Sequence, residues 1–186
     1  MSPLVSLAKS AVEAYIIDGK IISPPDILPG EFLKRRAGAF VTIEKNRKLR
    51  GCIGTYSATK KNIVEEIIHN AISAAINDYR FNPIKVGELA ELSYTVYILT
   101  EPELVRDISE LNPKKFGIIV KGQGFSSPDV IFSPAPRPYQ KTGILLPDLE
   151  GIDTAEKQIS IVCQKAEIDS NRENIIIYRF SVEKYD

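Results

Sequence analysis

The elements that the sequence predicts occur in the same order twice, and this doubling limits the possible folds more than any single motif does. Each half predicts a helix, two strands, a second helix and a third strand. In the first half these elements span 3–18, 39–44, 49–55, 60–78 and 92–99, and in the second half they span 107–111, 116–120, 143–146, 154–167 and 175–182. Successive strands joined by short turns pair antiparallel. The sequence therefore predicts an α+β fold in which two pseudo-duplicated halves share one curved, mostly antiparallel sheet.

Two helices are predicted most clearly. Residues 3–18 carry an apolar stripe that begins after a Ser2 cap and ends at Gly19. Residues 60–78 present a wide apolar face after Asn62 or Thr59, either of which could cap the helix. The residues that we expect to be buried are Ile63, Val64, Ile67, Ile68, Ala71, Ile72, Ala74 and Ala75. The residues that we expect on the opposite, polar face are Glu65, Glu66, His69, Asn70, Ser73 and Asn77.

The predicted strand at residues 49–55 holds the most distinctive chemistry. Alternation predicts that Leu49 and Ile53 anchor this strand to the core. On the other face, Arg50 lies two residues from Cys52, close enough to favour a thiolate. A neighbouring cation lowers the pKa of a thiol from about 8.5 into a range of about 3.5 to 7.5. The alternative is that Cys52 packs as a small hydrophobe, as cysteines outside disulfides commonly do.

Two further features surround that strand. Gly51 and Gly54 would leave the thiol in an open notch, unless a closely approaching backbone needs the space. The segment after the second helix, residues 77–83, contains Asp78 and Arg80, which could pair locally and fix the turn. Alternatively, these two side chains line the notch beside the strand, because the helix follows the strand directly in the sequence.

Length and composition indicate one domain, residues 1–186, with halves at about 1–105 and 106–186. Residues 122–142 are rich in Pro, Gly and Ser and interrupt the second half as an insertion-like loop. Its Phe125, Phe132, Arg137 and Tyr139 could form a lid or a partner contact, or the insertion has no special role. No apolar run reaches the length that spans a membrane, and two cysteines make no disulfide framework, so we expect a cytoplasmic protein.

Charge and motif content narrow the function classes. The chain has no net charge, although residues 1–61 hold 11 basic and 5 acidic residues. A nucleic-acid-associated protein is therefore possible but not favoured. His69 is the only histidine, and paired-cysteine motifs are absent, so we expect no metal site. We expect Cys163 to lie in the core and His69 to face solvent.

Four stretches carry a resemblance to a known family. They are GAFVTI at 38–43, LRGCIGT at 49–55, NAISAAINDYRF at 70–81 and GILLPDL at 143–149. Together they resemble the AMMECR domain family, whose prokaryotic members are called AmmeMemoRadiSam system protein A. The resemblance implies two β3α2-type repeats that share a barrel-like sheet. It also implies that a Memo-like protein and a radical SAM enzyme are partners.

The residues that match the family motifs are the candidate site. They are Arg50, Gly51, Cys52, Ile53, Gly54, Asp78, Arg80 and Phe81. We expect an accessory module that binds a ligand or a partner through the LRGCIG strand, with an unknown cofactor requirement. The alternative is a cysteine-dependent enzyme in which Arg50 tunes a catalytic Cys52. Association with nucleic acid is the third hypothesis.

Overall fold

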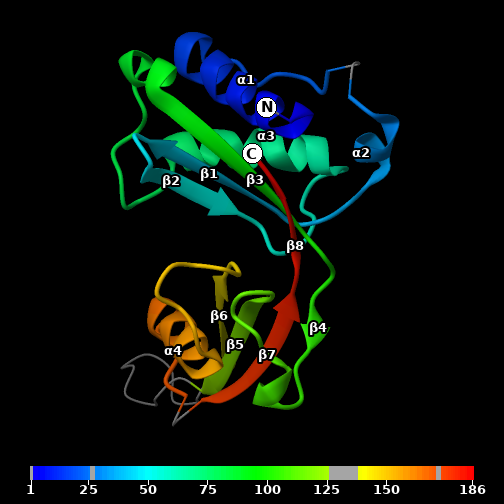
Figure 1. The fold of residues 1–186 in the computed structure, drawn as a ribbon, viewed down its shortest axis with the longest axis vertical. Helices are drawn as coiled ribbons and strands as arrows, with labels where there is room; N and C mark the ends of the chain where they lie inside the picture. Colours follow the sequence, from blue (N-terminus) through cyan, green and yellow to red (C-terminus); the bar gives the residue numbers. More distant parts are fainter. Residues whose placement is uncertain (1, 26–27, 126–137, 171–172) are drawn as a thin grey trace. The chain divides into compact units, whose positions relative to one another are not determined.

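Hydrogen bonding divides the strands of the computed structural model into two four-stranded sheets (Figure 1). The structure describes residues 2–25, 28–125, 138–170 and 173–186. In the first sheet the strand order is β2-β1-β3-β8, and in the second it is β4-β7-β5-β6. The α+β class is therefore confirmed. The single sheet expected from the sequence is not present, because no strand of one group is paired with a strand of the other among the described residues.

The first compact unit comprises residues 1–100 and 183–186, and the second comprises residues 101–182. The elements before residue 101 are α1 (Pro3–Asp18), α2 (Gly30–Lys34), β1 (Ala39–Lys45), β2 (Lys48–Gly54), α3 (Ile63–Ile76), the 3₁₀ helix η1 (Val86–Glu91) and β3 (Leu92–Leu99). The later ones are β4 (Glu103–Leu104), the 3₁₀ helix η2 (Ile108–Glu110), β5 (Gly117–Phe125), β6 (Pro138–Leu145), α4 (Ala155–Lys165), β7 (Asn174–Phe180) and β8 (Val182–Tyr185). None of the helices within the described residues is long and apolar enough to cross a membrane.

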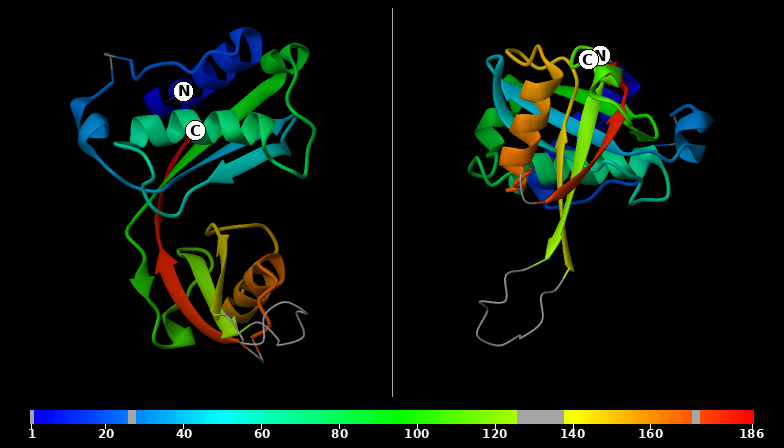
Figure 2. Two further views of the ribbon diagram at one scale, coloured as in Figure 1. Left: turned by 180° about the vertical axis from the view of Figure 1, so that it is seen from behind. Right: turned by 90° about the horizontal axis from the view of Figure 1, so that it is seen from below.

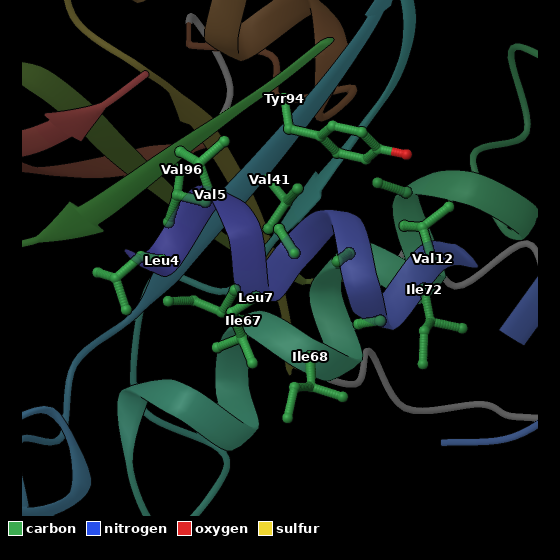
Figure 3. Close-up of a cluster of buried hydrophobic side chains, with 14 of the residues drawn as sticks. Leu4, Val5, Leu7, Val12, Val41, Ile67, Ile68, Ile72, Tyr94 and Val96 are labelled. Atoms are coloured by element: carbon green, nitrogen blue, oxygen red, sulfur yellow. The ribbon is translucent and has the colours of Figure 1, made fainter. Parts of the chain in front are cut away.

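The core of the first unit forms where α1 and α3 pack against each other and against the sheet (Figures 1 and 2). Strand β1, predicted at 39–44, buries alternate residues, and the predicted apolar faces of both helices are buried as well. Figure 3 shows side chains of the helices, β1 and β3 in one cluster, among them Leu4, Val41, Ile67 and Val96. Alternation in the strands and helical periodicity therefore both point to the same core.

The ends of both helices follow their capping residues. The Ser2 side chain accepts a hydrogen bond from the Val5 amide, and Gly19 takes the left-handed conformation that ends α1. At the start of α3, the Asn62 side chain accepts from the Glu65 amide at 2.9 Å, so Asn62 is the cap. The helix predicted at 60–78 spans only Ile63–Ile76. Asn62 caps its start, and at its end the Asn77 amide donates to the Ser73 carbonyl.

Glu66 and Asn70 are buried, which corrects their assignment to the solvent face of α3. The loop between β2 and α3 folds back over them. Glu66 accepts hydrogen bonds from the hydroxyls of Thr55 and Thr59 and from the amides of Thr59 and Lys60, at 2.7 to 2.8 Å. Burial raises the pKa of Glu66, but these four donors outweigh burial and lower it. The Glu66 carboxylate thus accepts from the Thr59 and Lys60 amides, which could otherwise bind an anionic ligand.

In the second unit, α4 packs on β5 and β6 (Figure 2). Val162 and Cys163 of α4 are buried, which confirms the predicted place of Cys163 in the core. Burial raises the pKa of this thiol. The ends of the segment 122–142 belong to strands β5 and β6, so both strands are longer than predicted. Residues 126–137, including Phe132 and Arg137, lie outside the described residues, as do the side chains of Phe125 and Tyr139.

The C-terminal strand completes the first sheet. β8 lies next to β3, although it follows β7 of the second sheet in the sequence. The guanidinium of Arg35 donates two hydrogen bonds to Glu183 of β8, at 2.6 and 2.8 Å. The Thr95 hydroxyl of β3 donates to Asp186 at 3.0 Å. The first unit is therefore built from two separate parts of the chain.

We predict that deletion of residues 182–186 destabilises the first unit, because β3 loses its neighbour and becomes an exposed edge. The expected loss is on the order of 2 kcal/mol, which lowers the melting temperature by about 6 °C for a chain of this size. Thermal unfolding followed by circular dichroism measures this change. The control is Glu183→Gln, which removes one surface ion pair and is expected to cost less than about 1 kcal/mol. Equal melting of the deletion variant and the full chain would show that β8 adds no stability.

Candidate functional site

Strand β2 is an edge strand of the first sheet, and Cys52 lies in its middle. Cys52 pairs with Thr42 of β1, and the Cys52 sulfur lies 3.3 Å from the Thr42 hydroxyl oxygen. The Cys52 amide donates to Asp78 and so points away from β1. This is the geometry of a pair without mutual backbone hydrogen bonds, in which opposing side chains approach most closely. The thiol is partly buried.

Asp78 and Arg80, from the turn after α3, cover the outer edge of β2 at Cys52. The Cys52 amide donates to the Asp78 carboxylate at 2.9 Å, and the Cys52 carbonyl accepts from the Arg80 guanidinium at 3.4 Å. Arg80 also donates twice through its side chain to Asp78, at 2.7 and 2.9 Å. The two residues therefore pair locally, as the first interpretation predicts, and they also bond to the backbone of Cys52.

Neighbouring groups occupy the space beside the two glycines of the strand, so the glycines do not leave the thiol in an open notch. A Cβ atom at Gly51 would overlap the carbonyl oxygen of Ala74 in α3. A Cβ atom at Gly54 would overlap the ring of Phe40 and the carbonyl oxygen of Ala39. The absence of side chains at these two positions lets backbone and an aromatic ring approach the strand closely.

Arg50 does not follow the predicted alternation. Ile43 of β1 faces Gly51 and Glu44 faces Leu49, so Arg50 is the extra residue of a β-bulge. Bulges redirect a side chain and increase the local twist. Beyond the bulge, Leu49 is 41% exposed, which corrects its predicted role as a core anchor, whereas Ile53 packs on the core as predicted.

The redirected Arg50 side chain pairs with Glu88 of η1. Its guanidinium donates two hydrogen bonds to the Glu88 carboxylate, both at 3.0 Å, and only 16% of its side chain is exposed. The carboxylate neutralises the cation that was expected to stabilise a Cys52 thiolate. The tuning of Cys52 by Arg50 stays a prediction, and Glu88 gives Arg50 a structural partner.

Phe81 joins the two ion pairs into one cluster. The guanidinium carbon of Arg50 lies 6.0 Å from the centroid of the Phe81 ring, and that of Arg80 lies 5.5 Å from it. A cation at about this distance from a ring is attracted by its quadrupole. The residues of two sequence motifs, 49–54 and 77–81, therefore meet in three dimensions. We call Arg50, Cys52, Asp78, Arg80, Phe81 and Glu88 the β2-edge cluster.

Both carboxylates of the cluster are held in their ionised form. The Arg80 guanidinium, aided by the Cys52 and Arg80 amides, lowers the pKa of Asp78 to about 2 although burial opposes this. The Arg50 guanidinium likewise lowers the pKa of Glu88 to about 2. The Asp78 carboxylate in turn raises the pKa of Arg80, and Cys52 acts in the same direction. The carboxylates of Asp78 and Glu88 are thus ionised throughout the physiological pH range.

Sequence reasoning missed three residues in or beside the β2-edge cluster: Glu88, Thr42 and Tyr79. Glu88 lies in a 3₁₀ helix that was not predicted, and Thr42 was assigned only to a strand face. Tyr79 stands between Asp78 and Arg80 and is 93% exposed, the largest value among the exposed large hydrophobic residues. Only its place in the sequence could have pointed to Tyr79, because this residue lies inside the motif at 70–81.

The remaining expectations concern metals and basic residues. No group of three potential metal-ligating side chains occurs among the described residues. His69 is half-buried on α3. Several cations of the basic N-terminal region form ion pairs: Lys9 with Glu13, Arg35 with Glu183, Lys45 with Glu88 and Glu91, and Arg50 with Glu88. These pairs reduce the positive charge on which the nucleic-acid hypothesis was based.

We predict that Gly51→Ala destabilises the protein by about 2 kcal/mol or more, because the new methyl group must displace the backbone of α3 at Ala74. Denaturant unfolding of both proteins measures the difference. Gly87→Ala is the matched control, since a Cβ atom at Gly87 meets nothing within 4 Å. A destabilisation by Gly51→Ala no larger than that of the control would contradict the close approach.

We predict that stability falls in acid through the β2-edge cluster. The ordinary pKa of Asp78 is 3.8 and its folded value is about 2, so its contribution is complete above about pH 5 and is lost as the pH falls from about 4 to 2. The loss for Asp78 is about 2 kcal/mol. Unfolding free energies measured across this range should change less for Asp78→Asn than for the native chain. Glu101→Gln, an exposed carboxylate outside the cluster, should retain the native pH dependence; equal curves for all three would refute the assignment.

Comparison with known proteins identifies the relatives of this chain. The AMMECR1 family model matches residues 5–185. A protein of Thermotoga maritima is 47% identical over 185 residues, which covers 98% of this chain and 97% of that protein. A Clostridium acetobutylicum protein is 39% identical over 184 residues, covering 98% of this chain but 36% of its own length.

The crystal structure of an uncharacterised protein from Pyrococcus horikoshii has a similar fold. It superposes with a TM-score of 0.79 at 30% sequence identity, covering 97% of this chain and 88% of that one. The names of these relatives state no activity. The family match, the full-length relatives and the common fold agree: the chain belongs to the AMMECR1 family.

Proposed function

We propose that this protein is an accessory module that binds a partner through the β2-edge cluster and the adjoining Tyr79. The observation that carries the proposal is the turn at residues 78–80, in which two ordered, hydrogen-bonded residues hold a 93% exposed tyrosine between them. Tyrosine and arginine are enriched among the residues that dominate binding energy at protein interfaces. A pre-ordered turn also loses less conformational entropy on binding.

The contacts of Cys52 favour binding over catalysis. The thiol lies against the Thr42 hydroxyl, with 3.3 Å between sulfur and oxygen. The backbone of Cys52 bonds to Asp78 and Arg80, so the residue acts as the point at which the turn is attached to the strand. The adjacent guanidinium of Arg50 is neutralised by Glu88.

The length of one relative supports an accessory role. In the Clostridium acetobutylicum protein, the homologous region is 36% of a longer chain, so the module there is covalently joined to additional sequence. A module that works beside other proteins is expected to occur in such a fused form. We propose that its partners are a Memo-like protein and a radical SAM enzyme, and that all three act in the cytoplasm as an AmmeMemoRadiSam system.

We further propose that residues 1–186 are one domain made of two internal repeats. The order β2-β1-β3 in the first sheet corresponds to β6-β5-β7 in the second. In each sheet a hairpin is followed by a helix, α3 or α4, and then by a strand that pairs antiparallel with the first strand of the hairpin. The fourth strand of each sheet follows the third strand of the other in the sequence. This reciprocal order supports a duplication with exchanged edge strands.

We predict that Tyr79→Ala weakens binding to the partner at least about tenfold, because it removes the exposed ring while the turn stays attached to β2. The measurement is isothermal titration calorimetry with the purified Memo-like protein and the radical SAM enzyme of the same genome. Tyr79→Phe should retain most of the affinity. Ile17→Ala is the control, since Ile17 is 59% exposed on α1 of the same unit. The proposal fails if neither protein binds, or if Tyr79→Ala binds as tightly as the native chain.

A further inference from the structure

A shallow, open pocket lies on the second unit, beside α4. Its apolar surface comes from Ile108 of η2, from Ile159 and Cys163 of α4, and from Ile168 in the loop that follows. Ile108 is 45% exposed although it is a large aliphatic residue. Glu156 and Glu167 stand among the lining residues, at the first turn of α4 and just after the end of this helix. This α4 pocket is separate from the β2-edge cluster, and the inference from it does not rest on the function proposed above.

The end of α4 shapes one wall of the pocket. Glu167 has a positive φ of 54°, so the chain reverses there after the last helical turn. The Ile168 amide then donates to the Cys163 carbonyl at 2.9 Å, and this bond returns Ile168 to the core. The reversal leaves the Glu167 side chain exposed beside an apolar surface.

The wall is held in place by contacts from β6 and from the start of β7. The Lys141 ammonium donates to the Glu167 carbonyl and, at 2.9 Å, to the buried Glu173 carboxylate. The Asp169 amide also donates to Glu173, at 3.1 Å. The Lys141 ammonium is thus directed at the backbone of the loop and at Glu173, and not at the Glu167 carboxylate. The pocket is therefore formed before any ligand binds, which lowers the entropic cost of binding.

The charged side chains that the structure describes in the lining of the pocket, those of Glu156, Glu167 and Asp169, are all acidic. Within the described part of the second unit, ion pairs join Lys114 to Asp148 and Asp153, Lys141 to Glu173, and Arg179 to Glu103 and Glu110, and none of them involves Glu156 or Glu167. Both carboxylates therefore remain available beside apolar side chains that are already partly desolvated. A complementary ligand has an aliphatic part for Ile108 and Ile159 and a cation for each carboxylate.

We propose that the α4 pocket binds a segment of a protein partner in which aliphatic side chains are flanked by lysine or arginine. The pocket is open to solvent, so side chains that project from a peptide can enter it while the peptide backbone stays outside. The aliphatic side chains cover Ile108, Ile159 and Ile168, and the basic side chains reach Glu156 and Glu167.

The test uses the full chain and three blocked tetrapeptides with the sequences Lys-Leu-Leu-Lys, Gln-Leu-Leu-Gln and Glu-Leu-Leu-Glu. Methyl-labelled isoleucines report binding by NMR, with the signals of Ile108, Ile159 and Ile168 assigned by conservative substitution. We expect saturable shifts of these signals with the lysine peptide. Its affinity should exceed that of the glutamine peptide about threefold to tenfold at low salt, and the difference should shrink as salt is added. The glutamate peptide should bind most weakly.

The variant Glu156→Gln/Glu167→Gln separates charge recognition from apolar contact. It should reduce the affinity for the lysine peptide to that for the glutamine peptide and leave the latter unchanged. Glu101→Gln/Glu150→Gln, which removes two exposed carboxylates of the same unit outside the pocket, should bind like the native chain. Equal binding of all three peptides, shifts confined to other isoleucines, or full affinity in the pocket variant would each overturn the proposal.

Discussion

The close approach of α3 to β2 at Gly51 is the constraint on which the β2-edge cluster depends. Because residue 51 has no side chain, the carbonyl of Ala74 lies where a Cβ atom would otherwise be. Ala74 is in the last turn of α3, and Asp78 follows four residues later. The helix therefore ends beside the strand, and the Asp78 and Arg80 side chains of the turn after it reach the backbone of Cys52. A larger residue at position 51 would push away the helix end and, with it, every contact between residues 77–81 and β2.

The turn at residues 78–80 covers part of the exposed edge of β2. An edge strand exposes backbone donors and acceptors that invite pairing with other chains. At Cys52 the carboxylate of Asp78 takes the place of a neighbouring carbonyl, and the guanidinium of Arg80 takes the place of a neighbouring amide. Two side chains thereby act as one residue of an absent strand. The same contacts fix the turn, so Tyr79 is presented to solvent by a structure that is stable without a partner.

Local pattern was enough to predict most of the first unit. Alternation located the buried residues of β1, and the Ser2 cap located the start of α1, whereas for α3 the sequence left Asn62 and Thr59 as alternative caps. The failures at Glu66 and Asn70 share a cause, since both are polar residues whose burial depends on partners from outside the helix: Thr55 donates to Glu66, and Asn70 donates to the Ala39 carbonyl of β1. Helical periodicity contains no information about such partners. The predicted direction of the Arg50 side chain was wrong for a related reason, because a β-bulge is defined only by the pairing of two strands. For the cluster, sequence reasoning found the members on β2 and on the turn but missed Glu88, whose link to Arg50 spans 38 positions.

Charge neutrality limits how the β2-edge cluster can recognise a ligand. Each arginine is paired with a carboxylate of lowered pKa, so the cluster as a whole attracts neither anions nor cations at long range. In the partner-binding role proposed above, recognition then relies on short-range contacts: the ring of Tyr79, the exposed part of the Arg80 guanidinium and the face of Phe81. Such contacts depend on shape and planar geometry, which suits a protein surface better than a phosphate backbone, where net charge dominates affinity. The charge balance of the cluster thus supports the proposed partner-binding role over nucleic-acid binding more directly than the composition of the chain does.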